Sequence, residues 1–85
     1  MKEFYYTVTD PVGIHARPAG MLAKRAKEFS SETVIEKEGK TANATRLMSV
    51  MGLCIKCGDQ VRVTVCGEDE ERAAEALEQF FKETL

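Results

Sequence analysis

The 85-residue sequence lacks three features that would each point to a different class of protein. Its formal net charge is −2, so it has no basic excess and a broad nucleic-acid-binding surface is not expected. It has no apolar run long enough to cross a bilayer or to serve as a signal peptide. Its three cysteines cannot all pair within one chain, which disfavours a secreted disulfide scaffold. We therefore expect a cytoplasmic protein without membrane insertion, whose partners are proteins and not nucleic acid.

The length and composition favour one small domain. Hydrophobic residues make up 44% of the chain, which supplies an adequate but thin core. Because helices or strands alone could hardly supply that core, we expect two layers, with helices packed on a sheet. The sequence has no repeat, low-complexity segment or linker, so residues 1–85 are predicted to form a single domain and a monomer.

The first half of the chain predicts a strand, a loop and a helix. Residues 4–8 alternate in character, as in a half-buried strand, and the proline and glycine of residues 10–13 end it. From residue 19 to residue 29 apolar side chains recur at helical spacing. Pro18 then falls in the first turn, where proline is tolerated. We expect a helix of about three turns that starts at or just after His15.

The second half predicts two short strands, a helix, a strand and a last helix. Residues 30–33 are interpreted as a loop, and residues 38–40 as a hairpin turn after a strand through residues 34–35. Residues 45–53 suit a short helix ending near Gly52, although their apolar density also suits a buried strand. Alternation predicts a strand at residues 60–66. The core face of the last helix is expected to comprise Ala73, Leu77, Phe80 and Phe81. The whole order indicates an α+β fold.

His15 is the only histidine, and it stands where a helix is expected to begin. Free backbone N–H groups and the helix dipole make such a position a ready anion site. A neutral imidazole nitrogen can attack phosphorus without a separate base, and Arg17 adds a fixed cation two residues away. The plain alternative is that His15 only caps the helix while Arg17 pairs with a nearby carboxylate.

The residues around His15 form a longer motif, Gly13-Ile14-His15-Ala16-Arg17-Pro18-Ala19. This motif resembles the signature of the HPr family, the histidine-containing phosphocarriers of the bacterial phosphoenolpyruvate:sugar phosphotransferase system. The length, the element order, the Gly39-Lys40 turn and the stretch from Leu47 to Leu53 are also similar to HPr. The resemblance implies an open-faced β-sandwich, in which three helices cover one side of a four-stranded antiparallel sheet (β-α-β-β-α-β-α).

The resemblance also implies a function. In similar proteins Enzyme I, charged by phosphoenolpyruvate, phosphorylates the signature histidine, which passes the group to the A domains of Enzyme II permeases. It places the phosphate on Nδ1 of His15 and assigns its stabilisation to Arg17. The free N–H groups of the helix start, those of Ala16 and Arg17, are the expected backbone ligands. We expect a covalent intermediate in phosphoryl transfer, not a turnover enzyme, that needs no cofactor or metal ligand set.

A docking surface is expected beside His15. By composition alone the apolar segment around residues 47–51 favours a core position. Resemblance to HPr instead implies that some of its side chains form an apolar docking patch with the first helix. The implied docking residues are Met21, Leu47, Met48 and Met51. Lys24 and Lys27 could form a basic rim, although a merely solvated helix face explains them equally well.

Two positions depart from the family. Many HPr proteins carry a regulatory serine where this chain has Arg46. Because arginine cannot accept phosphate by serine chemistry, we predict that the regulatory branch is absent, provided that Thr45 and Ser49 do not replace it. Gly20 should weaken the first helix slightly.

Cys54 and Cys57 have the spacing of a redox pair or half a zinc site, and Cys66 is a third thiol. Because there is no second such pair, we expect ordinary reduced cysteines and no metal site. A small redox or metal protein is the third function considered, after a sugar phosphocarrier and an HPr-like paralogue with a regulatory or adapter role.

Overall fold

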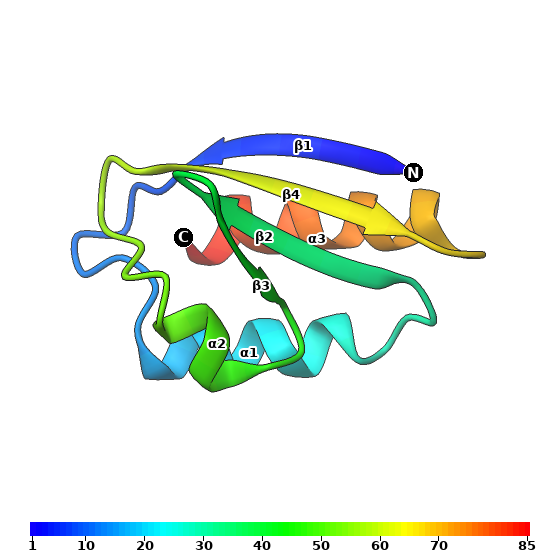
Figure 1. The fold of residues 1–85 in the computed structure, drawn as a ribbon, viewed down its shortest axis with the longest axis horizontal. Helices are drawn as coiled ribbons and strands as arrows, with labels where there is room; N and C mark the ends of the chain where they lie inside the picture. The colour runs from blue at the N-terminus through cyan, green and yellow to red at the C-terminus, as the bar shows by residue number, and fades with distance from the viewer.

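A four-stranded antiparallel sheet forms one layer of the computed structural model, which describes all 85 residues, and three helices cover one face of that sheet (Figure 1). The elements follow the chain as β1 Lys2–Thr7, α1 Ala16–Ala26, β2 Glu32–Lys37, β3 Lys40–Asn43, α2 Leu47–Met51, β4 Gln60–Cys66 and α3 Glu70–Thr84. This is the predicted open-faced β-sandwich with its β-α-β-β-α-β-α order, and the α+β prediction is confirmed.

The strand order in the sheet is β1-β4-β2-β3, so β4 lies between β1 and β2. Val63 of β4 is opposite Phe4 on one side and Ile35 on the other, and Val61, Val63 and Val65 are all buried. The alternating pattern of the sequence therefore gives one inward row of valines along the centre of the sheet.

The helices complete the core on that same face. α3 packs on β1 and β4, α2 packs on β3, and α1 contacts both other helices (Figure 1). Phe81 of α3 is fully buried, and its ring lies edge-on 5.7 Å from Phe4 and 5.5 Å from Tyr6. Residues 73, 77 and 81 are buried as predicted, whereas Phe80 is only half-buried. None of the helices has the length and apolar character required to span a membrane.

The turn between β2 and β3 is a two-residue hairpin. Glu38 and Gly39 have φ angles of 51° and 83°, and positive φ at both positions is the geometry that matches the twist of the flanking strands. The segment around residues 45–53 forms helix α2 with Gly52 as its C-cap, so the alternative of a buried strand was wrong.

Two predicted strands differ from the observed ones at their ends. β1 spans Lys2–Thr7, whereas residues 4–8 were predicted. β2 begins at Glu32, inside the predicted loop of residues 30–33, because Glu32 and Thr33 are opposite Cys66 and Val65 of β4. α1 has 11 residues, the three turns that were predicted, and Phe29, which shares its helical spacing, lies in the connection that follows. The Asp69 carboxylate accepts hydrogen bonds from the N–H groups of Ser30 and Ser31, and these contacts hold the chain in the connection that follows α1.

Candidate functional site

His15 lies at the junction of the loop that follows β1 and helix α1. It is the N-cap of α1, with extended backbone angles of φ −116° and ψ −168°, and its side chain is exposed. The helix therefore starts directly after His15, as the sequence predicted. This position puts the only histidine of the chain at the positive end of a helix dipole.

The loop before His15 is held in a tight turn. The Asp10 carboxylate accepts a hydrogen bond from the Val12 N–H at 2.8 Å, and the Asp10 carbonyl accepts one from the Gly13 N–H at 2.9 Å. Gly13 has φ +79°, and a methyl group added there would lie 2.7 Å from Lys56 Cα. Only glycine fits at this position, because both the backbone angle and the close approach exclude a side chain.

The first turn of α1 leaves two amide groups without helical partners. The Ala19 N–H donates to the His15 carbonyl at 2.9 Å, and Pro18 has no N–H to offer. The N–H groups of Ala16 and Arg17 precede these positions, so no carbonyl within the helix can accept from them. They can bind an anion beside His15, and no acidic residue occupies this first turn.

The side chains of His15 and Arg17 are not engaged elsewhere in the structure. His15 makes no capping hydrogen bond, and no carboxylate lies within ion-pair distance of the exposed Arg17 guanidinium. The plain alternative, a capping histidine beside a paired arginine, is therefore not what the structure has. Both groups are exposed to an incoming ligand.

A shallow cavity of about 390 Å³ lies against these residues. His15, Arg17, Pro18 and Met21 line it from α1, while Asp10 comes from the preceding loop. Glu83 and Thr84 of α3 complete the lining. The segment at the end of the chain also supports the loop, since the Leu85 oxygen accepts hydrogen bonds from the Thr9 and Asp10 N–H groups.

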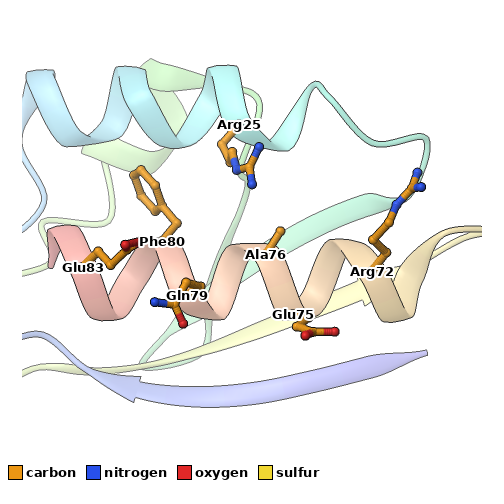
Figure 2. Close-up of a pocket in the computed structure, with 7 residues that line it drawn as sticks. All are labelled: Arg25, Arg72, Glu75, Ala76, Gln79, Phe80 and Glu83. Atoms are coloured by element: carbon orange, nitrogen blue, oxygen red, sulfur yellow. The ribbon is translucent and has the colours of Figure 1, made fainter.

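A second depression, of about 450 Å³, lies between α1 and α3 away from His15 (Figure 2). Arg25 lines it from α1, and the other labelled residues come from α3. They are Arg72, Glu75, Ala76, Gln79, Phe80 and Glu83. Its walls carry charges of both signs and no histidine or cysteine. This depression offers no nucleophile, so we place the candidate site at His15.

The implied docking residues differ in how far they are exposed. Met48 is 75% exposed, Met21 45% and Leu47 37%, whereas Met51 is half-buried against the core. Val12, in the turn before His15, is 67% exposed and was not singled out from the sequence. The only sequence feature that pointed to the exposure of Val12 was its position after Pro11 in a predicted loop. The exposed apolar side chains thus lie on α1, α2 and the loop that carries His15.

Three exposed cations at α1 and α2 have no acidic partners within the protein. Lys24, Lys27 and Arg46 are exposed and form no ion pair, whereas Arg25 pairs with Glu28 at 2.5 Å. Arg46 is the N-cap of α2 and directly precedes the exposed Leu47 and Met48. These three cations are therefore free to meet carboxylates of a partner.

Two other polar positions near α2 differ in accessibility. Thr45 is half-buried, and its hydroxyl donates to the Asn43 side chain at 2.7 Å, while Ser49 is exposed. Cys54, Cys57 and Cys66 are free and exposed. No group of three potential metal-binding side chains is present.

The four-stranded sheet, the three helices and the exposed histidine at the start of the first helix form the arrangement that the resemblance to HPr implied. The family model described as the PTS HPr component phosphorylation site matches residues 2–83. The chain belongs to the HPr family of phosphotransferase system phosphocarriers.

Individual relatives agree with this assignment. The chain is 48% identical to the phosphocarrier protein HPr of Lysinibacillus sphaericus over 77 residues, 91% of this chain and 88% of that protein. A crystal structure of an HPr from Thermoanaerobacter tengcongensis superposes with a TM-score of 0.92 at 36% identity, covering 96% and 92% of the two chains. Crh of Bacillus subtilis, solved as a domain-swapped dimer, gives 0.79 at 35% identity, with 94% and 92% covered.

Proposed function

We propose that this protein accepts a phosphoryl group from phosphorylated Enzyme I on His15 and donates it to the A domains of Enzyme II for sugar uptake. The observation that carries the proposal is the exposed, unengaged His15 at the N-cap of α1, beside the Ala16 and Arg17 amides that have no helical acceptor. Phosphoenolpyruvate is the original donor, and Enzyme I receives its phosphoryl group first.

The transfer is an in-line displacement at phosphorus. The lone pair on Nδ1 of His15 forms the new N–P bond while the bond between phosphorus and the donor atom breaks, and the donor keeps that electron pair. The Ala16 and Arg17 N–H groups donate hydrogen bonds to the negative oxygens, and the Arg17 guanidinium compensates their charge. The chain's own contribution is alignment and charge stabilisation, without a cofactor or a metal.

The protein acts as a reactant that is consumed and regenerated, and not as a turnover enzyme. A nucleophilic side chain of the A domain then forms a new bond to phosphorus by a second in-line displacement, while the N–P bond breaks and leaves its electron pair on Nδ1 of His15. The same exposed surface must then serve a donor and an acceptor in turn. Flexible methionines such as Met21 and Met48 suit this task, because they adapt to partners of different shape.

Arg46 separates this carrier from relatives that use a regulatory serine. We propose that the protein carries phosphate on His15 only, because Arg46 stands in place of the serine whose hydroxyl a kinase would modify. To test this, the protein is incubated with a serine kinase of HPr proteins and ATP, and the product is mapped. The proposal predicts no incorporation, and modification of Thr45 or Ser49 that slows phosphotransfer would refute it.

The second candidate is an HPr-like paralogue with a regulatory or adapter role. This second candidate is supported by the similarity of the chain to Crh of Bacillus subtilis, a catabolite repression protein. A pure adapter needs neither His15 nor Arg17. Transfer from the phosphorylated protein to an Enzyme II A domain distinguishes the two, since an adapter would bind without passing on the group.

We propose that the protein works in the cytoplasm, a reducing compartment in which its three free cysteines stay unpaired. We propose that it is a monomer, since the sheet and its core need no second chain. Sedimentation or light scattering during active phosphotransfer tests the monomer. A stable dimer that remains active would contradict this part of the proposal.

The main test is a phosphotransfer assay. The protein is incubated with Enzyme I, magnesium and labelled phosphoenolpyruvate, followed by an A domain. We expect acid-labile phosphate on the wild type, its onward transfer, and no label on His15→Ala. An unlabelled wild type would refute the carrier function, and label that survives His15→Ala would refute the site.

A further inference from the structure

The loop that carries His15 rests on a second loop, formed by residues 54–59 between α2 and β4. The Ile14 N–H donates to the Ile55 carbonyl at 3.0 Å, and both isoleucines are buried. The Val8 N–H donates to the Asp59 carbonyl at 2.9 Å at the other end of the contact. The position of the His15 backbone therefore depends on where residues 54–59 are held.

Lys37 joins the two ends of this second loop. Its Nζ lies 2.8 Å from Asp59 Oδ2 and donates to the Cys54 carbonyl at 2.7 Å. The same Asp59 oxygen accepts the Lys56 N–H at 2.8 Å, which closes the loop on itself. One ammonium group thus fixes both the first and the last residue of the segment that supports His15.

The surroundings of Lys37 make this contact firm. Its side chain is only 14% exposed, less than that of any other cation that forms an ion pair in the protein. The hydrogen bond with Asp59 raises the pKa of Lys37, and the same bond lowers the pKa of Asp59, so both groups stay charged near neutral pH. Lys37 is also the last residue of β2, opposite Lys40 in the hairpin, which fixes its backbone.

The contact with Lys37 helps to hold the backbone of Cys54 in an unfavourable conformation. Its φ of +54° lies in the left-handed region, which residues other than glycine seldom adopt. Such a conformation persists only where the surrounding contacts determine it. The hydrogen bond from Lys37 to the Cys54 carbonyl is one such contact.

We propose that Lys37 is a positioning residue for His15, acting through Asp59 and residues 54–59 without touching the phosphoryl group. The inference rests on the proposed function for its kinetic part. In-line transfer requires the imidazole nitrogen to be aligned with phosphorus, so a shift in the loop slows the transfer step. Docking through Met21, Leu47 and Met48 is unaffected, because these exposed residues of α1 and α2 are not part of the contact.

The test compares Lys37→Met with Asp59→Asn and with Lys40→Met. Methionine keeps the aliphatic stem of Lys37, and asparagine keeps an oxygen for the Lys56 N–H while removing the charge. Lys40 is exposed, lies in the same hairpin and forms no ion pair, so it is the matched control. Each variant is assayed for hydrogen exchange of the Ile14 amide and for the kcat and KM of transfer from the phosphorylated protein to an A domain.

In Lys37→Met and Asp59→Asn the Ile14 amide hydrogen should exchange faster. Both variants should transfer the phosphoryl group about tenfold more slowly at saturating A domain, with KM unchanged within about twofold. Lys40→Met should match the wild type. Wild-type exchange at Ile14 in both variants would overturn the proposal, as would wild-type kcat despite faster exchange.

The test also distinguishes a variant that fails to fold from a failure of the proposed function. If Lys37→Met does not fold, Asp59→Asn alone decides, because it leaves the lysine in place. If Enzyme I fails to label the wild type, the proposed function is refuted, while Ile14 exchange still decides whether Lys37 holds the loop.

Discussion

The amide of Ile14 and the carbonyl of Ile55 form a 3.0 Å hydrogen bond that ties the residue before His15 to the loop after α2. Residues far apart in the sequence thus set the start of α1 together. The next residue back, Gly13, lies so close to this loop that no side chain fits between them. The site depends as much on this backbone contact as on the motif residues themselves.

Gly13→Ala tests this closeness directly. The methyl group would meet the backbone of Ile55 and Lys56, and φ +79° is unfavourable for alanine, so we expect a loss of about 1–3 kcal/mol in the free energy of unfolding. Phosphotransfer should fall as well, because the loop must move. Urea denaturation and the transfer assay measure the two effects.

Gly20→Ala is the matched control. Gly20 lies within α1 with no atom near its missing side chain, so alanine should stabilise the protein by about 1 kcal/mol. Equal effects of the two alanines would show that the close approach at Gly13 has no energetic weight.

Thr33→Val should stabilise the protein by about 1 kcal/mol, since the Thr33 hydroxyl is buried without a hydrogen-bond partner and valine has the same shape. Thermal unfolding of the variant measures this. The control, Thr64→Val, changes a half-buried threonine on the open face and should have little effect. A less stable Thr33→Val would mean that the hydroxyl has a partner in solution.

Asp69 should make the protein sensitive to acid. Hydrogen bonds from the Ser31 hydroxyl and from the Ser30 N–H lower the pKa of Asp69 from 3.8 to about 2. A carboxylate with a lowered pKa stabilises the folded state above its unfolded pKa, and this contribution is lost as the pH falls from about 4 to about 2. Asp69→Asn should lower the urea midpoint at pH 7 and flatten its decline in acid.

Glu75→Gln is the control for that experiment, because Glu75 is exposed and forms no ion pair. Glu70 and Asp59 also have lowered pKa values, so some decline should remain in Asp69→Asn. An unchanged acid profile in Asp69→Asn would contradict the assigned hydrogen bonds.

Met48→Asp tests the docking surface. Met48 is 75% exposed, so the free energy of unfolding should change by less than about 0.5 kcal/mol. A charge in an apolar contact should raise the KM for the A domain by about tenfold. Tyr5→Asp places the same charge on the helix-free face and should leave KM unchanged. Equal effects of the two variants would refute docking at α2.

Most of the fold follows from local sequence patterns. The alternating valines of β4 and the helical spacing in α3 each predict one element, because the burial period differs between strands and helices. The start of β2 did not follow, since Glu32 and Thr33 are ordered by pairing with β4, which no local pattern contains. The connection after α1 is likewise held by Asp69, a residue distant in the sequence, through the N–H groups of Ser30 and Ser31.

In the candidate site, too, some features follow from the local sequence and others do not. The motif predicted that His15 starts a helix and that the Ala16 and Arg17 amides are available, because these properties belong to the helix terminus itself. It could not predict the exposure of Val12, the half-burial of Met51, or the contact between Lys37 and Asp59. These depend on how α2 and residues 54–59 pack against the rest of the chain.

The most direct test of the central claim is to locate the phosphate on the imidazole of His15. The protein is phosphorylated with Enzyme I and phosphoenolpyruvate, and its ring nitrogens are examined by phosphorus and nitrogen NMR at alkaline pH, where phosphohistidine persists. We predict one phosphate per chain, bonded to Nδ1 of His15. Phosphate on any other residue, or none at all, would contradict it.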